Sequence, residues 1–358
     1  MTSKFLILGE SFSETRRLRV IRKLIDFIDY GFTYENVLID KLERWCEENR
    51  DVLQKNYIDP SGLVGPSLKH KSSKNYLKVA ESLGLVKNFY GKWLLTKYGN
   101  VLSKLPEYEQ SLELGVHEIC FFVKLLLKKD ITNLLALRQA LKETEKPSEI
   151  PEAFKKAVLE EVLRNYKKTR DPHIQLEIQK RLQKIKVWRP YRLNHIIIPR
   201  IHWLIDLKII DWEKYRHRIL SIQAKRDIIF ESISREIEKT TNIDDWIDNT
   251  YYEIFYSAYK DLLPSKVKFW KDIGDSCKYK VAEECIEKGF KILGSHEMRR
   301  VSLIPLLEYF GICLLIDNGI IVSFKELHEQ IRKVAMSRKD LTYRWVPYDK
   351  DGYIRQIS

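Results

Sequence analysis

The stretch of the chain between Ser72 and Leu105 limits the fold more than any other. Apolar residues recur at helical spacing over residues 73–83, which predicts an amphipathic helix that a serine hydroxyl caps at its start. Gly84 follows, and glycine ends helices because it adopts the left-handed conformation without steric cost. The helix is therefore expected to stop sharply and to pass directly into the next element.

Two short strands are predicted after this helix. Residues 85–89 and 92–95 read as strands, and Tyr90-Gly91 between them fits a tight hairpin turn. Thr96 is placed to cap a further amphipathic helix, because its hydroxyl can accept a hydrogen bond from an open amide of the first turn. The predicted order is therefore helix, hairpin, helix.

This order, with its Leu83-Gly84-Leu85 and Leu95-Thr96 signatures, resembles the winged-helix form of the helix-turn-helix domain over about residues 34–105. The resemblance implies that the helix before the hairpin enters the major groove of DNA and that the hairpin touches the backbone. The nucleic-acid-binding candidates on the helix are Lys74, Asn75, Lys78 and Ser82, and those on the hairpin are Lys87, Asn88, Tyr90 and Lys92. Winged helices also dock proteins, so the fold alone leaves both functions open.

The distribution of charge favours nucleic acid over a docking role. Between Lys69 and Lys104 the chain carries eight lysines and a single acid, Glu81, and the whole chain has a formal net charge of +13. Such a balance favours a polyanionic partner, with DNA expected ahead of RNA or an acidic protein. Lys69 and Lys71 extend the candidate surface ahead of the helix. A solvated lysine face is the alternative explanation.

Two further segments are basic. A helix is predicted within residues 1–33, and its first half is crowded with cations, namely Arg16, Arg17, Arg19, Arg22 and Lys23. Either it is a solvated face or it is an arm that contacts phosphates or a partner. Residues 144–151 read as a linker, and the two helices predicted in residues 152–194 are again rich in Lys and Arg. These helices are a second nucleic-acid-facing surface or a solvated bridge.

Two later segments echo the first motif. Residues 195–231 contain a helix and a hairpin whose wing would add Lys214, Arg216 and Arg218 to the binding candidates, although Lys208 stands where the pattern has glycine. Residues 302–358 contain two predicted helices and a terminal hairpin. Residues 106–143 are expected to form a helical core extension, and residues 232–301 a helical region. The expected fold class is mainly α and multi-helical, with one to three winged-helix modules that contribute small β-hairpins.

Catalysis and metal binding find little support in the sequence. An acidic cluster raises the hypothesis of a metal-dependent nuclease, and its members are Asp244, Asp245, Asp248 and Glu253. An acidic helix start that complements the helix dipole explains these residues better. His117 lies among apolar residues without a second ligand at helical spacing, which favours a core histidine. No catalytic residue, metal or cofactor is predicted.

The sequence thus predicts a non-enzymatic nucleic-acid-binding protein, with double-stranded DNA as the expected partner. The alternative is an adaptor subunit of a larger nucleic-acid-handling assembly, such as an antiviral-defence complex, in which the winged folds dock another protein. Five dispersed cysteines, none in a C-x-x-C pair, indicate reduced thiols and an intracellular, cytoplasmic protein. No run of apolar residues reaches the length of a membrane span.

Overall fold

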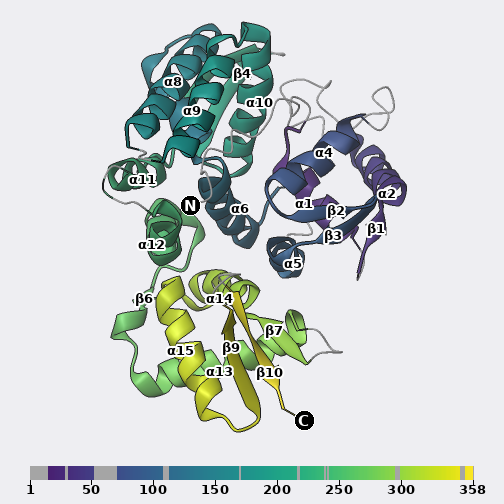
Figure 1. Cartoon of the computed structure of the whole chain (residues 1–358), viewed down its shortest axis with the longest axis vertical. Helices are drawn as coiled ribbons and strands as arrows, with labels where there is room; N and C mark the ends of the chain where they lie inside the picture. Colours follow the sequence, from purple (N-terminus) through teal and green to yellow (C-terminus); the bar gives the residue numbers. More distant parts are fainter. Residues whose placement is uncertain are drawn as a thin grey trace. The chain divides into compact units, whose positions relative to one another are not determined.

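The computed structural model describes residues 15–28, 31–51, 71–107, 113–168, 171–215, 218–237, 239, 242–294, 299–346 and 351–357. Within these ranges the chain is mainly helical and contains four small sheets, which confirms the expected fold class at that level (Figure 1). The chain divides into two compact units. Unit 1 comprises residues 1–94, 109–114 and 125–230, and unit 2 comprises residues 95–108, 115–124 and 231–358.

Unit 1 begins with a group of helices and strands that we call the N-terminal module. Its described elements are α1 (Leu18–Asp26), β1 (Thr33–Tyr34), α2 (Glu35–Glu48), α4 (Lys71–Ser82), β2 (Val86–Phe89) and β3 (Lys92–Leu95). The strands form a sheet in the order β1-β3-β2, in which β1 pairs antiparallel with β3 through Thr33↔Trp93 and Tyr34↔Lys92. The predicted helix and both predicted strands are confirmed, although the helix begins at Lys71 and the first strand at Val86.

The apolar stripe of α4 fixes how this helix packs. Its members Tyr76, Leu77 and Ala80, together with Leu83, are at most 1% exposed. Gly84 ends the helix with φ +75°, and the amides of Gly84 and Leu85 donate to the carbonyls of Glu81 and Ala80, each at 2.8 Å. This closing pattern satisfies carbonyls that the end of a helix leaves open, and it turns the chain directly into β2.

The rest of unit 1 is a helical array with a second hairpin. It contains the end of α6 (Val116–Lys129), α7 (Ile131–Glu143), η3 (Pro147–Glu149), α8 (Ile150–Lys168), α9 (Pro172–Lys186), α10 (Pro190–Asp206), β4 (Ile210–Tyr215), β5 (Arg218–Ala224) and the start of α11 (Ile228–Ile237). Residues 144–151, which the sequence marks as a linker, contain η3 and the start of α8. They therefore lie inside unit 1 and do not separate the two units.

The turn after α10 repeats the turn after α4. Lys208 occupies the position of Gly84 and has φ +57°; its amide donates to the carbonyl of Ile205 at 2.8 Å, and the amide of Ile209 donates to Leu204 at 2.9 Å. A side chain in this conformation costs about 1–2 kcal/mol, so the departure from glycine is tolerated with strain. The helix before this turn, α10, continues through Pro199.

Arginines in unit 1 hold helices together from the inside. The Arg200 guanidinium of α10 donates to both carboxylate oxygens of Asp130, at 2.7 and 3.0 Å, and both side chains are fully buried. Arg17, just before α1, binds Asp206 at 2.8 Å, while Arg19 and Arg22 within α1 are also buried. The prediction of a solvated or phosphate-binding face is therefore wrong for these α1 arginines, because folding encloses them.

Unit 2 carries a second three-stranded sheet. Its described elements are α5 (Lys97–Lys104), the start of α6, the rest of α11, α12 (Ile243–Ala258), η4 (Lys260–Leu262), β6 (Lys268–Phe269), η5 (Trp270–Asp272), α13 (Asp275–Ile292), β7 (Arg300–Ser302), α14 (Leu303–Asn318), β8 (Ile320–Ile321), α15 (Phe324–Ser337), β9 (Leu341–Val346) and β10 (Asp351–Gln356). We call α13 to β10 the C-terminal module. Its sheet has the order β7-β10-β9, with both pairings antiparallel.

The core of unit 2 combines close helix packing with a buried cation. A Cβ on Gly311 of α14 would come within 2.6 Å of the Tyr252 hydroxyl of α12, so glycine permits these two helices to approach. Lys124 of α6 donates to the Glu308 carboxylate at 2.7 Å and lies 3.1 Å from Asp248, and its ammonium group is almost fully enclosed. Burying the charges of Lys124 and Glu308 costs desolvation energy, and their close opposite charges offset that cost.

Candidate nucleic-acid interface

The outer face of α4 carries the exposed lysines of the N-terminal module. Lys74 and Lys78 lie four residues apart, hence on the same side of the helix, and both are exposed. Asn75 is only 7% exposed, because it lies on the side of α4 that faces the core. The expectation that Asn75 faces a groove is therefore corrected. Ser82, at the end of α4, is half-buried.

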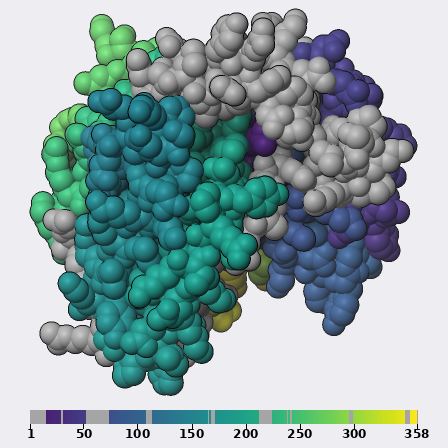
Figure 2. Space-filling model, turned by 90° about the horizontal axis from the view of Figure 1, so that it is seen from above, coloured from purple at the N-terminus to yellow at the C-terminus, as the bar shows by residue number. Residues whose placement is uncertain are grey.

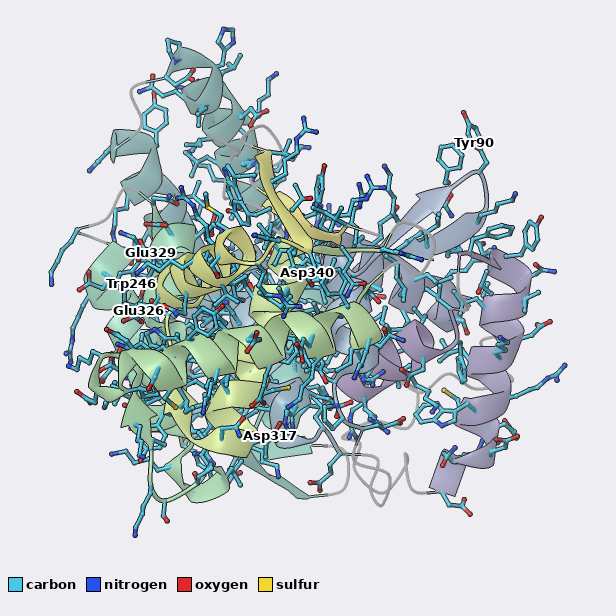
Figure 3. The ribbon with its side chains drawn as sticks, turned by 90° about the horizontal axis from the view of Figure 1, so that it is seen from below. Tyr90, Trp246, Asp317, Glu326, Glu329 and Asp340 are labelled. Carbon is cyan, nitrogen blue, oxygen red and sulfur yellow. The ribbon has the colours of Figure 1, made fainter. Side chains whose placement is uncertain are left out.

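The turn of the β2–β3 hairpin presents an aromatic side chain to solvent. Tyr90 and Gly91 have φ of +51° and +77°, as a two-residue turn with a twist that matches the strands requires. Asn88 supports the turn, since its side-chain oxygen accepts from the Gly91 amide at 3.1 Å. Tyr90 is 90% exposed and projects from the hairpin tip (Figure 3). Lys87 on β2 is exposed beside it.

Two aromatic side chains lie close to Lys92, the lysine of β3. The Lys92 ammonium lies 4.3 Å from the centre of the Phe32 ring and 5.6 Å from that of Tyr34, within the range of a cation–π interaction. Phe32, Tyr34 and Phe89 are all exposed large hydrophobics. Sequence reasoning missed these three residues. The pairing of β1 with β3, which no local pattern in the sequence indicated, brings Phe32 and Tyr34 to Lys92.

Few acids counter these cations. Lys74 lies 3.3 Å from Glu35, the first residue of α2, and Glu35 also accepts from the Trp93 indole at 3.3 Å. Among the residues that the structure describes, no carboxylate lies within ion-pair distance of Lys78 or Lys87. Glu81, the one acid of this stretch, is occupied by the Asn88 amide, which donates to it at 3.3 Å. The face of α4 and its hairpin therefore carries net positive charge.

Five of the predicted nucleic-acid-binding residues have side chains that the structure does not describe. Lys69 and Arg216 are outside the described residues. The backbones of Lys71, Lys214 and Arg218 belong to α4, β4 and β5, but their side chains are not described. The predicted contacts whose side chains are described on the N-terminal module are Lys74, Asn75, Lys78, Ser82, Lys87, Asn88, Tyr90 and Lys92. Trp188, which follows α9, is buried, and Tyr191, at the start of α10, is exposed.

The acidic cluster has a structural explanation in unit 2. Asp244 and Asp245 occupy the first turn of α12, where the helix dipole favours negative charge, and the Asn242 side chain accepts from the Asp245 amide at 3.4 Å. Asp248 binds the buried Lys124. Within the described ranges these carboxylates do not gather into a group with metal-ligand geometry. The explanation as a helix start is confirmed for Asp244 and Asp245.

Comparison of the chain with known protein families, with curated proteins and with solved structures finds no match. No helix in the described part of the chain combines the length and the apolar character that crossing a lipid bilayer requires.

Proposed function

We propose that this chain binds nucleic acid, double-stranded DNA before RNA, and that the N-terminal module is a winged helix that makes the principal contact. The observation that carries the proposal is the group of exposed cations on α4 and on the hairpin that follows it, with Lys78 and Lys87 lacking acidic partners in the described structure. The succession of α4, a tight turn and the β2–β3 hairpin supports it, because winged helices place such a helix in the major groove.

In this mode, α4 lies in the groove and Lys74 and Lys78 reach the phosphates or base edges on either side of it. The hairpin then lies against the backbone, where Lys87 and Lys92 neutralise phosphates and Tyr90 contacts sugar. Asn75 is buried, so the amide that could recognise adenine in two hydrogen bonds is absent from the surface. Binding is therefore expected to depend mainly on phosphate charge and only weakly on sequence.

Two further hairpin regions extend the proposal. We propose that α10–β4–β5 and the C-terminal module are also winged helices. The turn at Lys208 reproduces that at Gly84, and the sheet order β7-β10-β9 corresponds to β1-β3-β2 when each sheet is followed from its first strand. We expect the C-terminal module to contribute less to binding than the N-terminal module. It pairs several of its cations internally, as Arg338 does with Asp340 at 2.7 Å.

The test is a charge reversal on the N-terminal module. Replacing Lys74, Lys78, Lys87 and Lys92 together with glutamate is expected to weaken binding to a mixed-sequence duplex by about 100-fold at low salt. The slope of log affinity against log salt should also become shallower by about 3–4, because four phosphate contacts are lost. Fluorescence anisotropy measures both, and circular dichroism checks that the variant folds.

A matched control comes from the C-terminal module, which offers four exposed cations: Lys325, Arg332, Lys333 and Arg344. Reversing these four changes the net charge equally and is expected to weaken binding by less than about 10-fold. If both quadruple variants lose the same affinity, overall charge explains binding and the proposed interface is wrong. If the unchanged chain binds no duplex at about 50 mM salt, the nucleic-acid proposal itself fails.

A second candidate function, the adaptor, rests on a different surface. The array of α8, α9 and α10 exposes Leu163, Leu176, Val187 and Tyr191. Figure 2 shows these helices as one broad continuous surface. Exposed large apolar side chains on one helical array suit a protein partner. Purification of the tagged chain from its native cells is expected to yield a stoichiometric companion, and substitution of Leu176 and Tyr191 with serine should release it.

A further inference from the structure

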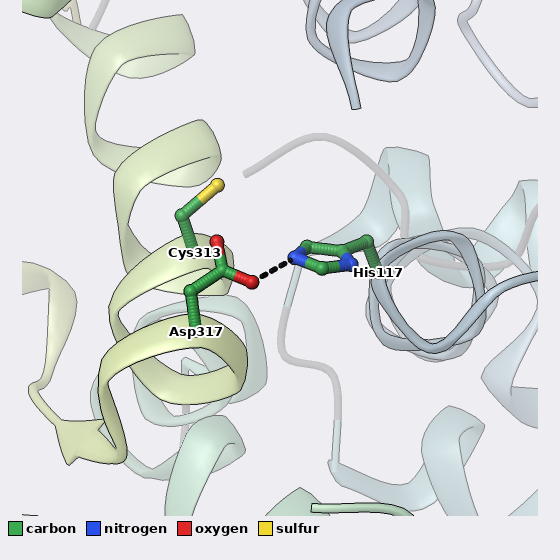
Figure 4. A group of neighbouring side chains, drawn as sticks. All are labelled: His117, Cys313 and Asp317. Atoms are coloured by element: carbon green, nitrogen blue, oxygen red, sulfur yellow. Dashed lines mark hydrogen bonds and ion pairs between the residues drawn. The ribbon is translucent and has the colours of Figure 1, made fainter. Parts of the chain in front are cut away.

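Unit 2 brings three metal-ligating side chains together from two helices. His117 lies in the first turn of α6, and Cys313 and Asp317 lie one turn apart near the end of α14. One ligand atom from each side chain, a ring nitrogen, the Sγ and a carboxylate oxygen, all fall within 4.8 Å of one another (Figure 4). These residues are separated by about 200 positions in the chain, so only the packing of α6 and α14 creates the group.

The contacts within the group already orient its members. His117 Nε2 and Asp317 Oδ1 are 2.8 Å apart, and Figure 4 shows the imidazole pointing at the carboxylate. Cys313 and Asp317 are four residues apart on α14, so their side chains leave the same face of the helix. The nearby cation Lys288 is itself paired with Glu284 at 3.2 Å.

The place of Asp317 near the end of α14 favours a bound cation, apart from the chemistry of the ligand atoms. Asp317 is in the last turn of α14, where the open carbonyl groups give the helix end a partial negative charge. A carboxylate there is unfavourable, and the last turn contains no basic residue. The Asp317 side chain is 50% exposed and that of His117 is 14% exposed, so an ion can reach the group from solvent while part of it is shielded.

We propose that His117, Cys313 and Asp317 bind a zinc ion, with the fourth coordination position left to water. The mixture of nitrogen, sulfur and oxygen ligands selects Zn²⁺ and disfavours Mg²⁺ and Ca²⁺, which prefer oxygen alone. On binding, the Cys313 S–H bond breaks, a zinc–sulfur bond forms and the proton passes to solvent. The thiolate and the carboxylate then balance the two positive charges of the ion.

The geometry requires only small side-chain movements. Tetrahedral zinc with bond lengths of about 2.0–2.3 Å places its ligand atoms about 3.5 Å apart. The group therefore has to contract by about 1 Å at its widest, which rotations of Cys313 and Asp317 can supply from the same helix face. The competing explanation is a simple ion pair between His117 and Asp317. That pair would need neither the sulfur nor a metal.

The experiment titrates the metal-free full chain with Co²⁺, which reports its ligands by absorption. One equivalent should produce a thiolate-to-cobalt charge-transfer band and visible bands typical of four-coordinate cobalt, and Zn²⁺ should remove them. Cys313→Ala should abolish the charge-transfer band. Cys277→Ala, which removes an exposed cysteine of α13, is the matched control and should keep it. Absence of the band in the unchanged chain, or its survival in Cys313→Ala, overturns the proposal.

Thermal unfolding provides a second measurement that does not depend on the cysteine variant. Zinc in about 100-fold excess over its Kd is expected to raise the Tm of the unchanged chain by about 5 °C or more. Asp317→Asn and His117→Gln, which are conservative in size, should lose most of this shift. If the variants fold and retain the full shift, zinc binds elsewhere and the site is wrong. If Tm does not respond to zinc in the unchanged chain, the simple ion pair is the correct explanation.

Discussion

The N-terminal and C-terminal modules share an order of elements but use their cations differently. Among the described elements of both, a helix precedes a short strand, two helices follow, and a hairpin closes a sheet in which the last strand lies in the middle; the C-terminal module has β8 in addition, between its two helices. The N-terminal module leaves Lys78 and Lys87 on its surface. The C-terminal module surrounds Arg338 with Asp340, Glu287 and Glu283, at 2.7, 3.2 and 3.4 Å. One topology therefore carries exposed lysines in one module and, beside exposed cations such as Lys325 and Arg332, an arginine held by three acids in the other.

This difference teaches that topology and surface charge are set by separate residues. The apolar stripes of α4 and α15 specify the packing of each module, since Tyr76 and Leu77 in one and Leu327 and Ile331 in the other are buried. The outward positions remain free to carry either sign of charge. A polyanion is consequently expected to distinguish the two modules, even where their backbones follow the same order.

The largest expected effect concerns a cation that is buried rather than exposed. Glu308→Ala removes the closest partner of Lys124 and leaves that ammonium in the core of unit 2 with Asp248 and neighbouring aromatic rings such as Tyr252. We expect the free energy of unfolding of unit 2 to fall by about 3 kcal/mol. Lys74→Ala, which removes an exposed pair with Glu35, should change stability by less than about 1 kcal/mol. Urea unfolding followed by hydrogen exchange measures both variants.

The double variant Lys124→Met with Glu308→Leu separates pairing from simple packing. Replacing both charges with apolar side chains of similar volume should restore most of the lost stability, because the two enclosed charges are gone and Asp248, which loses its contact with Lys124, is 23% exposed to solvent. If Glu308→Ala is no more destabilising than Lys74→Ala, the contrast between buried and exposed cations does not hold.

A smaller effect distinguishes the modules by pH. Burial, with a further contribution from Arg332, lowers the pKa of His328 in α15 below its ordinary value of 6.5. Because the unfolded chain binds a proton at this residue more readily than the folded chain, stability of the C-terminal module should fall as pH drops below 6.5. Hydrogen exchange at about pH 7.5 and about pH 5.5 should reveal this loss.

The same chain supplies two controls for this pH dependence, a variant of His328 and the N-terminal module. His328→Gln should flatten the pH dependence in the C-terminal module. Within residues 15–107 the sequence contains one histidine, His70, and it lies outside the described residues. The N-terminal module should therefore change little over the same range. Equal loss in both modules would assign the effect to other groups.

The smallest effect tests the repeated turn of unit 1. Gly84→Ala places a side chain at φ +75° and should destabilise the chain by about 1 kcal/mol. Lys208→Gly removes a side chain at φ +57° and should raise stability by about 0.5–1 kcal/mol, after the entropy that glycine adds to the unfolded chain is subtracted. Thermal melts measure both. Changes of the same sign would show that the two turns are not equivalent.

Much of the fold was predictable because its signals are local. The spacing of Tyr76, Leu77 and Ala80, the glycine at 84 and the cap at Thr96, whose hydroxyl accepts from Gly99 at 3.2 Å, each act within a few residues. The capping box of Ser323 and Glu326 on α15 is of the same kind. Lys74, Lys78, Lys87 and Tyr90 were correctly placed on the surface for this reason, since a known helix face or turn position determines exposure.

The part of the fold and of the candidate sites that the sequence did not predict depends on contacts between residues far apart in the chain. The amino-acid sequence alone determined where most helices and the β2–β3 hairpin form and which lysines lie outward on them, because backbone preferences and apolar periodicity are short-range. Only the tertiary structure decided that Arg17 is enclosed by Asp206, that Asn75 faces the core, and that His117 meets Cys313 and Asp317. These outcomes follow from packing between elements far apart in the chain, which no local pattern records.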